Sequence, residues 1–476
     1  MSLLRQGNSV FVSNTFLIFL SRFFPSLSSL GVILWFSRRL PREVYGFYTN
    51  FWIQLNLLVP VACFGIHVVI TTYSPSKIAA LRAAAGRYWQ LILLAWILLW
   101  AGVFSIIQTG YSGWQLSIPL LYFSAFSIVT ILESVYVVHK KFPALISVNF
   151  LYAAVFLGIH IQYDSAVSIP YPLFFCLLIL LILKLTVLLL AFRPQYEIDG
   201  DTLSAEKVRK ARSLWVHLGI YDITQNVFTW IDKFLVSLLL PAGLSAMYYN
   251  GTVNIPFLPM LLNAAGTGIL LQLSANEDVG DSTHTKQTLL NSGRMLSCIV
   301  FPIFAYLFFF RQEVILFLFS GRYADAVPVF AMTLLVLPLR AYSFTTVLQR
   351  HHLGREINTG SLGDMALACL LMYPMYKLLG LPGLALTFVI TTYLQAGYYL
   401  WAAGRVLNIS PFSLIPIANW STKLGIFSGL FFGLHYWITE TSVSYGNGLM
   451  AGGLLMVVCM VVSVLIDVKN KGIQKV

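Results

Sequence analysis

Charged side chains are scarce in this chain of 476 residues. Asp, Glu, Lys and Arg together make up 10% of it, whereas 58% of the residues are apolar and the mean hydropathy is +0.79. A soluble domain carries roughly 25% charged residues, so a soluble globule is excluded. The apolar residues form long blocks between short charged segments, which is typical of a polytopic helical membrane protein.

Sequence motifs for enzyme or metal chemistry are also missing. The five cysteines lie inside apolar blocks and form no CxxC pair, and the eight histidines show neither HxxxH nor HExxH spacing. These absences argue against a disulfide framework and against a metal site. The sequence contains neither a P-loop nor a Gly-Xaa-Ser-Xaa-Gly nucleophile elbow. We therefore predict a protein that is not an enzyme and needs no cofactor.

Basic residues outnumber acidic ones by 30 to 18, which gives a net charge of +12. They are scattered between the apolar blocks and form no basic domain, so a membrane surface explains them better than nucleic acid does. A block of about 20 apolar residues is long enough to cross a bilayer as a helix. The first block is too long for a signal-peptide core and is expected to be an uncleaved span. We predict fourteen spans, near residues 11–36, 45–71, 88–108, 118–138, 143–162, 171–192, 214–239, 245–273, 288–310, 324–349, 357–377, 381–404, 414–438 and 446–466.

An even number of spans places both termini on one side of the membrane. With both termini in the cytoplasm, the inner segments hold 18 Lys and Arg residues and the outer loops hold 6. This asymmetry follows the positive-inside rule. No outer loop exceeds about fifteen residues, whereas membrane glycan polymerases and ligases usually build a catalytic surface from a large external loop.

The two halves of the chain resemble each other at an offset of 200 residues. Six of 22 aligned positions are identical, including Pro41 with Pro241 and Tyr48 with Tyr248. Because the offset contains six spans, the two copies have the same orientation, and a substrate site is expected where they meet. We predict an all-α fold of two pseudo-symmetric six-helix lobes, residues 1–192 and 214–404. A cytoplasmic linker at 193–213 joins the lobes, and residues 405–476 form a C-terminal helix pair and a cytoplasmic tail.

Several charged side chains lie inside the predicted spans. Each costs roughly 3 kcal/mol at the bilayer centre, so each should face a partner or a water-filled cavity. Arg22 lies in the first span one turn before Pro25, which is expected to kink the helix. In the seventh span, polar residues recur every three or four positions and form one stripe on an apolar helix. This stripe consists of Asp222, Gln225, Asn226, Thr229, Asp232 and Lys233.

We predict a hydrated, positively charged cavity that binds the phosphate of an anionic substrate. Its cations are Arg22, Lys184, Lys233 and Arg340. Its other polar and ion-coupling residues are Asp222, Gln225, Asn226, Asp232 and Glu133. The alternative is that these charges form buried structural pairs, such as Arg22 with Asp222 or Arg340 with Glu133. In the thirteenth span, a row of Gly425, Gly429 and Gly433 either packs against the last span or forms a groove for a lipid tail.

Three segments resemble a known family. Residues 230–275, which begin WIDKFLVSLLLPAGL, resemble the seventh and eighth helices of the polysaccharide flippases in the multidrug/oligosaccharidyl-lipid/polysaccharide exporter superfamily. There, Asp232 and Lys233 match an Asp-Arg pair. Residues 20–48 look like the first two helices, and LFSGRYADAVPVF at 318–330 is similar to the segment that enters helix ten.

The resemblance implies two lobes that open alternately to cytoplasm and periplasm. They would move an undecaprenyl-pyrophosphate-linked oligosaccharide across the bacterial inner membrane, for O-antigen (lipopolysaccharide), capsule or related polysaccharide assembly. The implied partners are this substrate, membrane lipid and polysaccharide assembly proteins, and Arg22 stands where the family has a first-helix Arg. A lipid II flippase is the first alternative, followed by a cation or drug antiporter of the same superfamily, which would need acidic cavity residues. A membrane glycan polymerase or ligase is the alternative from another class.

Overall fold

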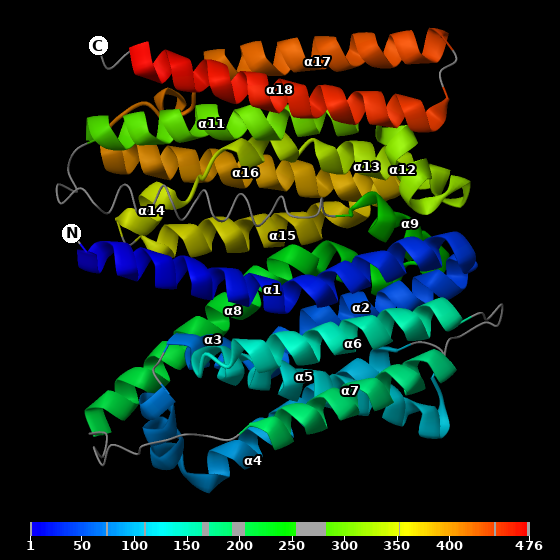
Figure 1. Ribbon diagram of the computed structural model, residues 1–476, viewed down its shortest axis with the longest axis vertical. Helices are drawn as coiled ribbons and strands as arrows, with labels where there is room; N and C mark the ends of the chain where they lie inside the picture. Colours follow the sequence, from blue (N-terminus) through cyan, green and yellow to red (C-terminus); the bar gives the residue numbers. More distant parts are fainter. Residues whose placement is uncertain are drawn as a thin grey trace. The chain divides into compact units, whose positions relative to one another are not determined.

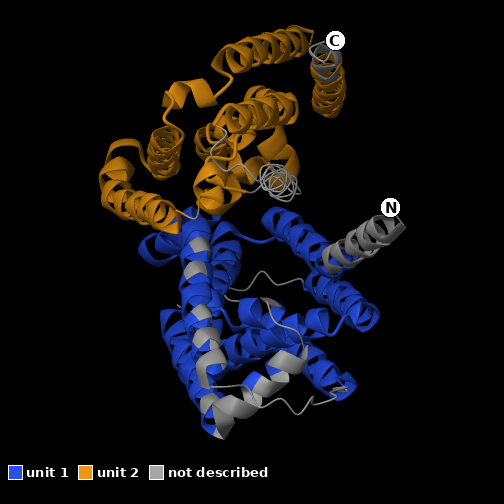
Figure 2. Ribbon diagram, turned by 90° about the vertical axis from the view of Figure 1, so that its left-hand side faces the viewer, with its two compact units in different colours: residues 1–246 blue, residues 247–476 orange. Residues whose placement is uncertain are grey.

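The residues described in a computed structural model of the protein are helical (Figure 1). These residues are 2–72, 75–108, 111–163, 171–192, 205–253, 282–351, 353–441 and 444–473. Within these ranges there are α-helices and short 3-10 helices and no strands, which confirms the all-α prediction. The chain divides into two compact units, Met1–Ala246 (unit 1) and Met247–Val476 (unit 2), which Figure 2 shows in different colours.

Unit 1 consists of long helices joined by short connections. The elements described there are α1 (Ser2–Arg39), α2 (Arg42–Cys63), α3 (Ile66–Thr72), α4 (Pro75–Ile107), η1 (Gly113–Leu116), α5 (Ser117–Val138), α6 (Phe142–Gln162), α7 (Tyr171–Ala191), α8 (Ala205–Leu239) and the start of α9 (Ala242–Gly251). Helix α1 packs along α6, α5 packs against α4 and α7, and α2 packs against α8. Residues 205–213 of the predicted linker form the first turns of α8, and residues 193–204 lie outside the described part of the chain.

Unit 2 combines long helices with shorter, broken ones. Its described elements after α9 are α11 (Ser282–Phe309), α12 (Arg311–Phe319), η2 (Gly321–Ala326), α13 (Val327–Leu334), η3 (Leu337–Ala341), α14 (Thr346–Arg350), α15 (Gly354–Leu379), α16 (Leu381–Leu407), η4 (Pro411–Leu414), α17 (Ile417–Glu440) and α18 (Tyr445–Ile473). Helix α15 packs against α16, and α11 packs against α17 and α18.

Eight helical stretches among the described residues are long and apolar enough to cross a membrane. They are 90–107, 113–138, 142–162, 171–191, 282–309, 321–341, 354–379 and 445–467, and each overlaps one predicted span. The chain is therefore a multi-pass membrane protein. The total of fourteen spans remains a prediction, and most of the eighth predicted span falls outside the described residues.

The second predicted span is broken between α2 and α3. Phe64 ends α2 in a left-handed conformation (φ 43°), and Gly65 follows with φ 65°. The break leaves carbonyl groups without helical donors, which is costly in a membrane. Trp215 Nε1 donates to the Phe64 carbonyl at 2.8 Å. Trp96 Nε1 donates at 3.2 Å to the Val61 carbonyl, which also accepts a hydrogen bond from the Phe64 N–H at 3.3 Å.

A pair of glycines lets α8 approach this break closely. A Cβ atom added at Gly65 would lie 2.5 Å from the Cα of Gly219, and one added at Gly219 would lie 2.8 Å from the Phe64 carbonyl oxygen. Both distances are far below van der Waals contact, so neither position has room for a side chain. The contact between the break and α8 therefore requires glycine at both positions, because the two backbones touch directly.

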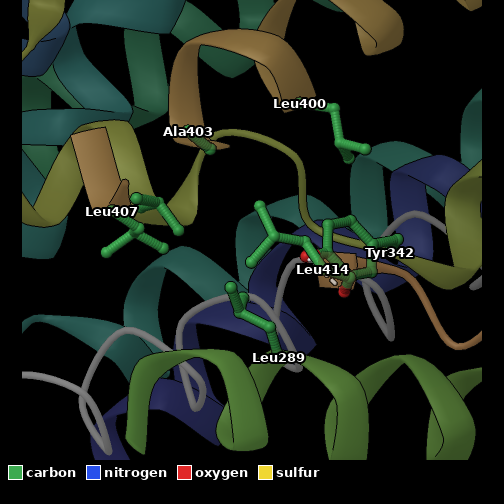
Figure 3. Close-up of a cluster of buried hydrophobic side chains, with 7 residues drawn as sticks. Leu289, Tyr342, Leu400, Ala403, Leu407 and Leu414 are labelled. Carbon is green, nitrogen blue, oxygen red and sulfur yellow. Dashed lines mark hydrogen bonds between the residues drawn. The ribbon is translucent and has the colours of Figure 1, made fainter. Parts of the chain in front are cut away.

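The tenth predicted span is broken as well, into α13, η3 and α14. A cluster of buried side chains holds this segment against α11 and α16, as Figure 3 shows. The cluster consists of Leu289, Tyr342, Val347, Leu400, Ala403, Leu407 and Leu414. Within it, the Tyr342 hydroxyl donates to the Leu414 carbonyl at 3.1 Å. This bond fixes the chain immediately after η3.

Helices α17 and α18 are tied to α11 by a buried lysine. Lys423 Nζ lies 2.8 Å from the Asp467 carboxylate on α18 and donates to the Arg294 carbonyl on α11 at 2.8 Å.

The glycine row of α17 does not contribute to this packing. Gly425, Gly429 and Gly433 are exposed, and a Cβ added at any of them would meet nothing within 4 Å. The prediction that the row packs against the last span is therefore wrong. Gly448 of α18 makes the close contact instead, because a Cβ there would lie 3.1 Å from the Ile438 side chain.

Candidate functional site

Arg22 lies on α1 in the turn before Pro25. Proline has no N–H, so the Ser21 carbonyl lacks its normal helical donor. Asn149 Nδ2 of α6 donates to this oxygen at 2.9 Å instead. The Arg22 side chain is exposed, and no carboxylate in the described part of the chain forms an ion pair with it. Arg22, in the helical turn before Pro25, is therefore available to bind an external anion.

Glu133 of α5 and Lys184 of α7 form an ion pair inside unit 1. The Nζ and Oε1 atoms are 2.7 Å apart. The Lys184 ammonium also lies 4.5 Å from the ring centroid of Tyr152 on α6. The sequence suggested Arg340 as a partner for Glu133, and the structure places Lys184 there.

Two polar side chains of α8 form hydrogen bonds with α2 in the described part of the chain: Asn226, which belongs to the polar stripe, and Ser237, which follows the stripe. Asn226 Nδ2 donates at 2.8 Å to the Asn56 carbonyl, which Pro60 leaves without a helical donor. About three turns further on, the Ser237 hydroxyl accepts a hydrogen bond from Gln54 Nε2 at 3.2 Å. These residues therefore satisfy polar groups of the neighbouring helix.

Asp222 belongs to the same stripe, one turn before Asn226. Its carboxylate lies 3.5 Å from Nε2 of His67 on α3. The sequence suggested Arg22 as its partner, and the structure places His67 there. Gln225 is on α8 as well, and its side chain lies outside the described residues.

Asp232 and Lys233 are buried in the last part of α8. The Lys233 ammonium lies 3.6 Å from the Asp232 carboxylate and 5.7 Å from the ring centroid of Trp230. The two neighbouring residues therefore offset each other's charge inside the helix bundle of unit 1.

Arg340 lies in η3, the 3-10 turn of the broken tenth span in unit 2. The chain after this turn is anchored by Tyr342, and the Leu335 carbonyl before it accepts a hydrogen bond from Tyr393 of α16 at 3.0 Å. The Arg340 side chain is exposed, and it has no carboxylate partner among the residues described. Arg340 therefore resembles Arg22: each arginine lies at an irregular part of its helix, next to Pro25 or in η3, that hydrogen bonds from other side chains stabilise.

The four predicted cations therefore fall into two kinds. Arg22 and Arg340 are exposed and carry no described counter-charge, whereas Lys184 and Lys233 are buried beside a carboxylate. No group of three or more His, Cys, Asp and Glu side chains that could hold a metal ion occurs in the described ranges.

Sequence reasoning missed the side chains that stabilise the helix irregularities. Asn149, Trp96 and Trp215 each donate to a carbonyl next to a proline or a break in a neighbouring helix, and none of them has an ionisable side chain. A usable signal was present. Each proline inside an apolar span leaves one carbonyl that needs a donor, so polar residues in neighbouring spans become candidates.

These observations define the class: a multi-pass, all-helical membrane protein built of two units, each presenting an exposed arginine at a helix irregularity. A family model described as "Polysaccharide biosynthesis protein" matches residues 90–328, which is half of the chain. The chain belongs to this family. A comparison with curated proteins gives no significant match.

Two solved structures have a similar fold. One is the lipid II flippase MurJ in an inward closed conformation, with a TM-score of 0.64 and 14% identity over 96% of this chain and 98% of that chain. The other is a multidrug resistance transporter of the MATE family in the MOP superfamily, in an inward-facing conformation. Its TM-score is 0.56, with 12% identity over 80% of this chain and 94% of that chain. The predicted all-α membrane fold is confirmed by these likenesses, and the predicted resemblance to polysaccharide biosynthesis proteins is confirmed by the family match.

Proposed function

We propose that the protein is an alternating-access flippase that moves an undecaprenyl-pyrophosphate-linked oligosaccharide across the bacterial inner membrane. The observation that carries the proposal is the exposed arginine of each unit, Arg22 beside Pro25 and Arg340 in η3. An unpaired guanidinium within a membrane span is costly unless water or an anion meets it. A pyrophosphate offers several acceptor oxygens to such planar donors.

In this proposal, the remaining predicted site residues contribute less to substrate binding than Arg22 and Arg340. Lys184 and Lys233 each already have a carboxylate neighbour, so they contribute less to binding a new anion. Asp222, Gln225, Asn226, Asp232 and Glu133 serve as structural or ion-coupling groups around the substrate path.

Family membership and fold support this proposal. The family is described by polysaccharide biosynthesis, and one structure of similar fold is a lipid II flippase. We further propose cytoplasmic termini, on the basis of the loop charges, and contacts with polysaccharide assembly proteins that supply or consume the oligosaccharide.

The test is translocation of a polyprenyl-pyrophosphate oligosaccharide by the purified protein in vesicles. Loss of one charge-assisted contact is worth about 1.5–3 kcal/mol, so Arg22→Ala and Arg340→Ala should each weaken substrate binding roughly 10- to 100-fold. Arg22→Lys keeps the charge and should retain part of the activity. Arg405→Ala is the matched control, because Arg405 is exposed in the last turn of α16 beside Trp401. Normal transport by both alanine variants, or none by the wild type, would refute the proposal.

Lipid II transport is the second candidate, and the similar fold of a lipid II flippase favours it. The two substrates share the polyprenyl pyrophosphate and differ in the attached glycan. Direct competition in the same vesicles separates them. Preferential movement of lipid II would replace the O-antigen or capsule assignment.

A further inference from the structure

An ion pair lies where α5, α6 and α7 of unit 1 pack together. Lys184 Nζ contacts Glu133 Oε1 at 2.7 Å and stands over the ring of Tyr152. Among the described residues, Glu133 is the one hydrogen-bond acceptor found for this ammonium. Removing the charge of Glu133 would therefore leave a buried cation with only an aromatic face as partner.

The two members of the pair differ in their exposure at the protein surface. The Lys184 side chain is 8% exposed, whereas the Glu133 side chain is 28% exposed. The carboxylate is therefore the more accessible member of the pair. When the carboxylate is neutral, the Tyr152 ring still attracts the ammonium, because a cation is drawn electrostatically to the face of an aromatic ring.

A second buried ion pair, in unit 2, has a different design. Lys423 and Asp467 are almost equally buried, with side-chain exposures of 11% and 12%. Lys423 also donates to the Arg294 carbonyl, Ser297 Oγ and Cys298 Sγ. Lys423 is therefore held by several acceptors besides its carboxylate, as expected of a structural ion pair, whereas Glu133 is the one acceptor found for Lys184 among the described residues.

Besides Lys184, the titratable groups near Glu133 are phenols and one histidine, so Glu133 is the carboxylate in this region that can take up a proton. Tyr152 faces the pair from α6, Tyr122 lies near Tyr152 on α5, and Tyr48 of α2 lies near Tyr122. Phenols stay protonated at physiological pH. Helix α3 also packs against α5 and carries His67, which is paired with Asp222.

We propose that Glu133 and Lys184 form a proton-exchange site that couples proton movement to transport, an inference that rests on the proposed function. A proton from water on one side of the membrane binds the Glu133 carboxylate. The charged Glu133–Lys184 contact becomes a contact between a neutral acid and an ammonium held by Tyr152, so the link between α5 and α7 weakens. Release of the same proton to water on the other side restores the ion pair and the link.

The test uses the full-length protein in vesicles and compares two paired substitutions. Glu133→Gln with Lys184→Met removes both charges of the pair, which avoids stranding one buried charge. Lys423→Met with Asp467→Asn is the matched control. We expect a pH gradient to accelerate translocation of a polyprenyl-pyrophosphate oligosaccharide by the wild type and the control. The Glu133/Lys184 double variant should remain folded and lose this acceleration at least tenfold.

A second measurement does not depend on the substrate. Infrared difference spectra between acidic and neutral pH should show the carbonyl band of a protonated carboxylic acid, and Glu133→Gln should remove that band. If the band is unchanged in Glu133→Gln and the double variant responds to the gradient like the wild type, the pair is structural and the inference fails. If the band titrates and disappears in Glu133→Gln while the wild type moves no substrate, the proton site stands and the proposed transport function fails.

Discussion

Replacement of Asn149 by leucine tests whether this asparagine supports the proline turn that presents Arg22. The change leaves the Ser21 carbonyl without its donor, which costs about 1–3 kcal/mol for a buried group. The Oδ1 atom of Asn149 is itself buried and has no partner in the described structure, so leucine also relieves that cost. We therefore expect a net loss near the lower end, about 1–2 kcal/mol. In a unit of this size, 1 kcal/mol corresponds to roughly 2–4 °C in Tm.

The assay is thermal unfolding in detergent, followed by tryptophan fluorescence, for both single variants and the double variant. Pro25→Ala restores an N–H that can donate to the Ser21 carbonyl in the normal helical way. In that background, Asn149→Leu should therefore cost little or nothing. An equal loss of Tm in both backgrounds would show that Asn149 acts through other contacts, and the reasoning would be refuted.

Two further substitutions test the break between α2 and α3. Gly65→Ala should destabilise the protein by about 2–5 kcal/mol, because its Cβ would overlap the Gly219 backbone and its φ is positive. Gly158→Ala is the control, since a Cβ there meets nothing within 4 Å, and equal Tm values for the two variants would contradict the proposed close contact. Asn226→Leu should lower the stability by about 1–3 kcal/mol in the same thermal assay. Pro60→Ala should remove that effect, and a persistent loss would show that the Asn56 carbonyl is not the reason.

The sequence predicted the helical membrane fold well because long apolar blocks leave a chain few alternatives. It did not predict the breaks in the second and tenth spans, after Cys63 and after Leu334. It did not predict the partners of buried charges. Helical spacing identifies which residues share a face, but it does not say which neighbouring helix meets that face. Asp222 pairs with His67, and Glu133 with Lys184, whereas the alternative interpretation of the sequence paired both carboxylates with arginines.

The glycine row of α17 shows the same limit. Small residues at every fourth position allow close packing, but they do not require it. In the structure, a Cβ atom at any of these glycines would meet nothing within 4 Å, whereas α17 and α18 meet at Gly448 and through the Lys423–Asp467 ion pair. The spacing of the glycines therefore identified a surface of α17 that permits close packing, but it did not identify which helix, if any, packs there.

The fluorescence of Trp96 and Trp215 should report on the break in the second span. Each ring nitrogen donates to a carbonyl that a continuous helix would keep for itself. If α2 and α3 straightened during a transport cycle, both rings would lose these acceptors and their emission would shift. Fluorescence from these two positions, with other tryptophans replaced, would then follow the bending of a single helix in real time.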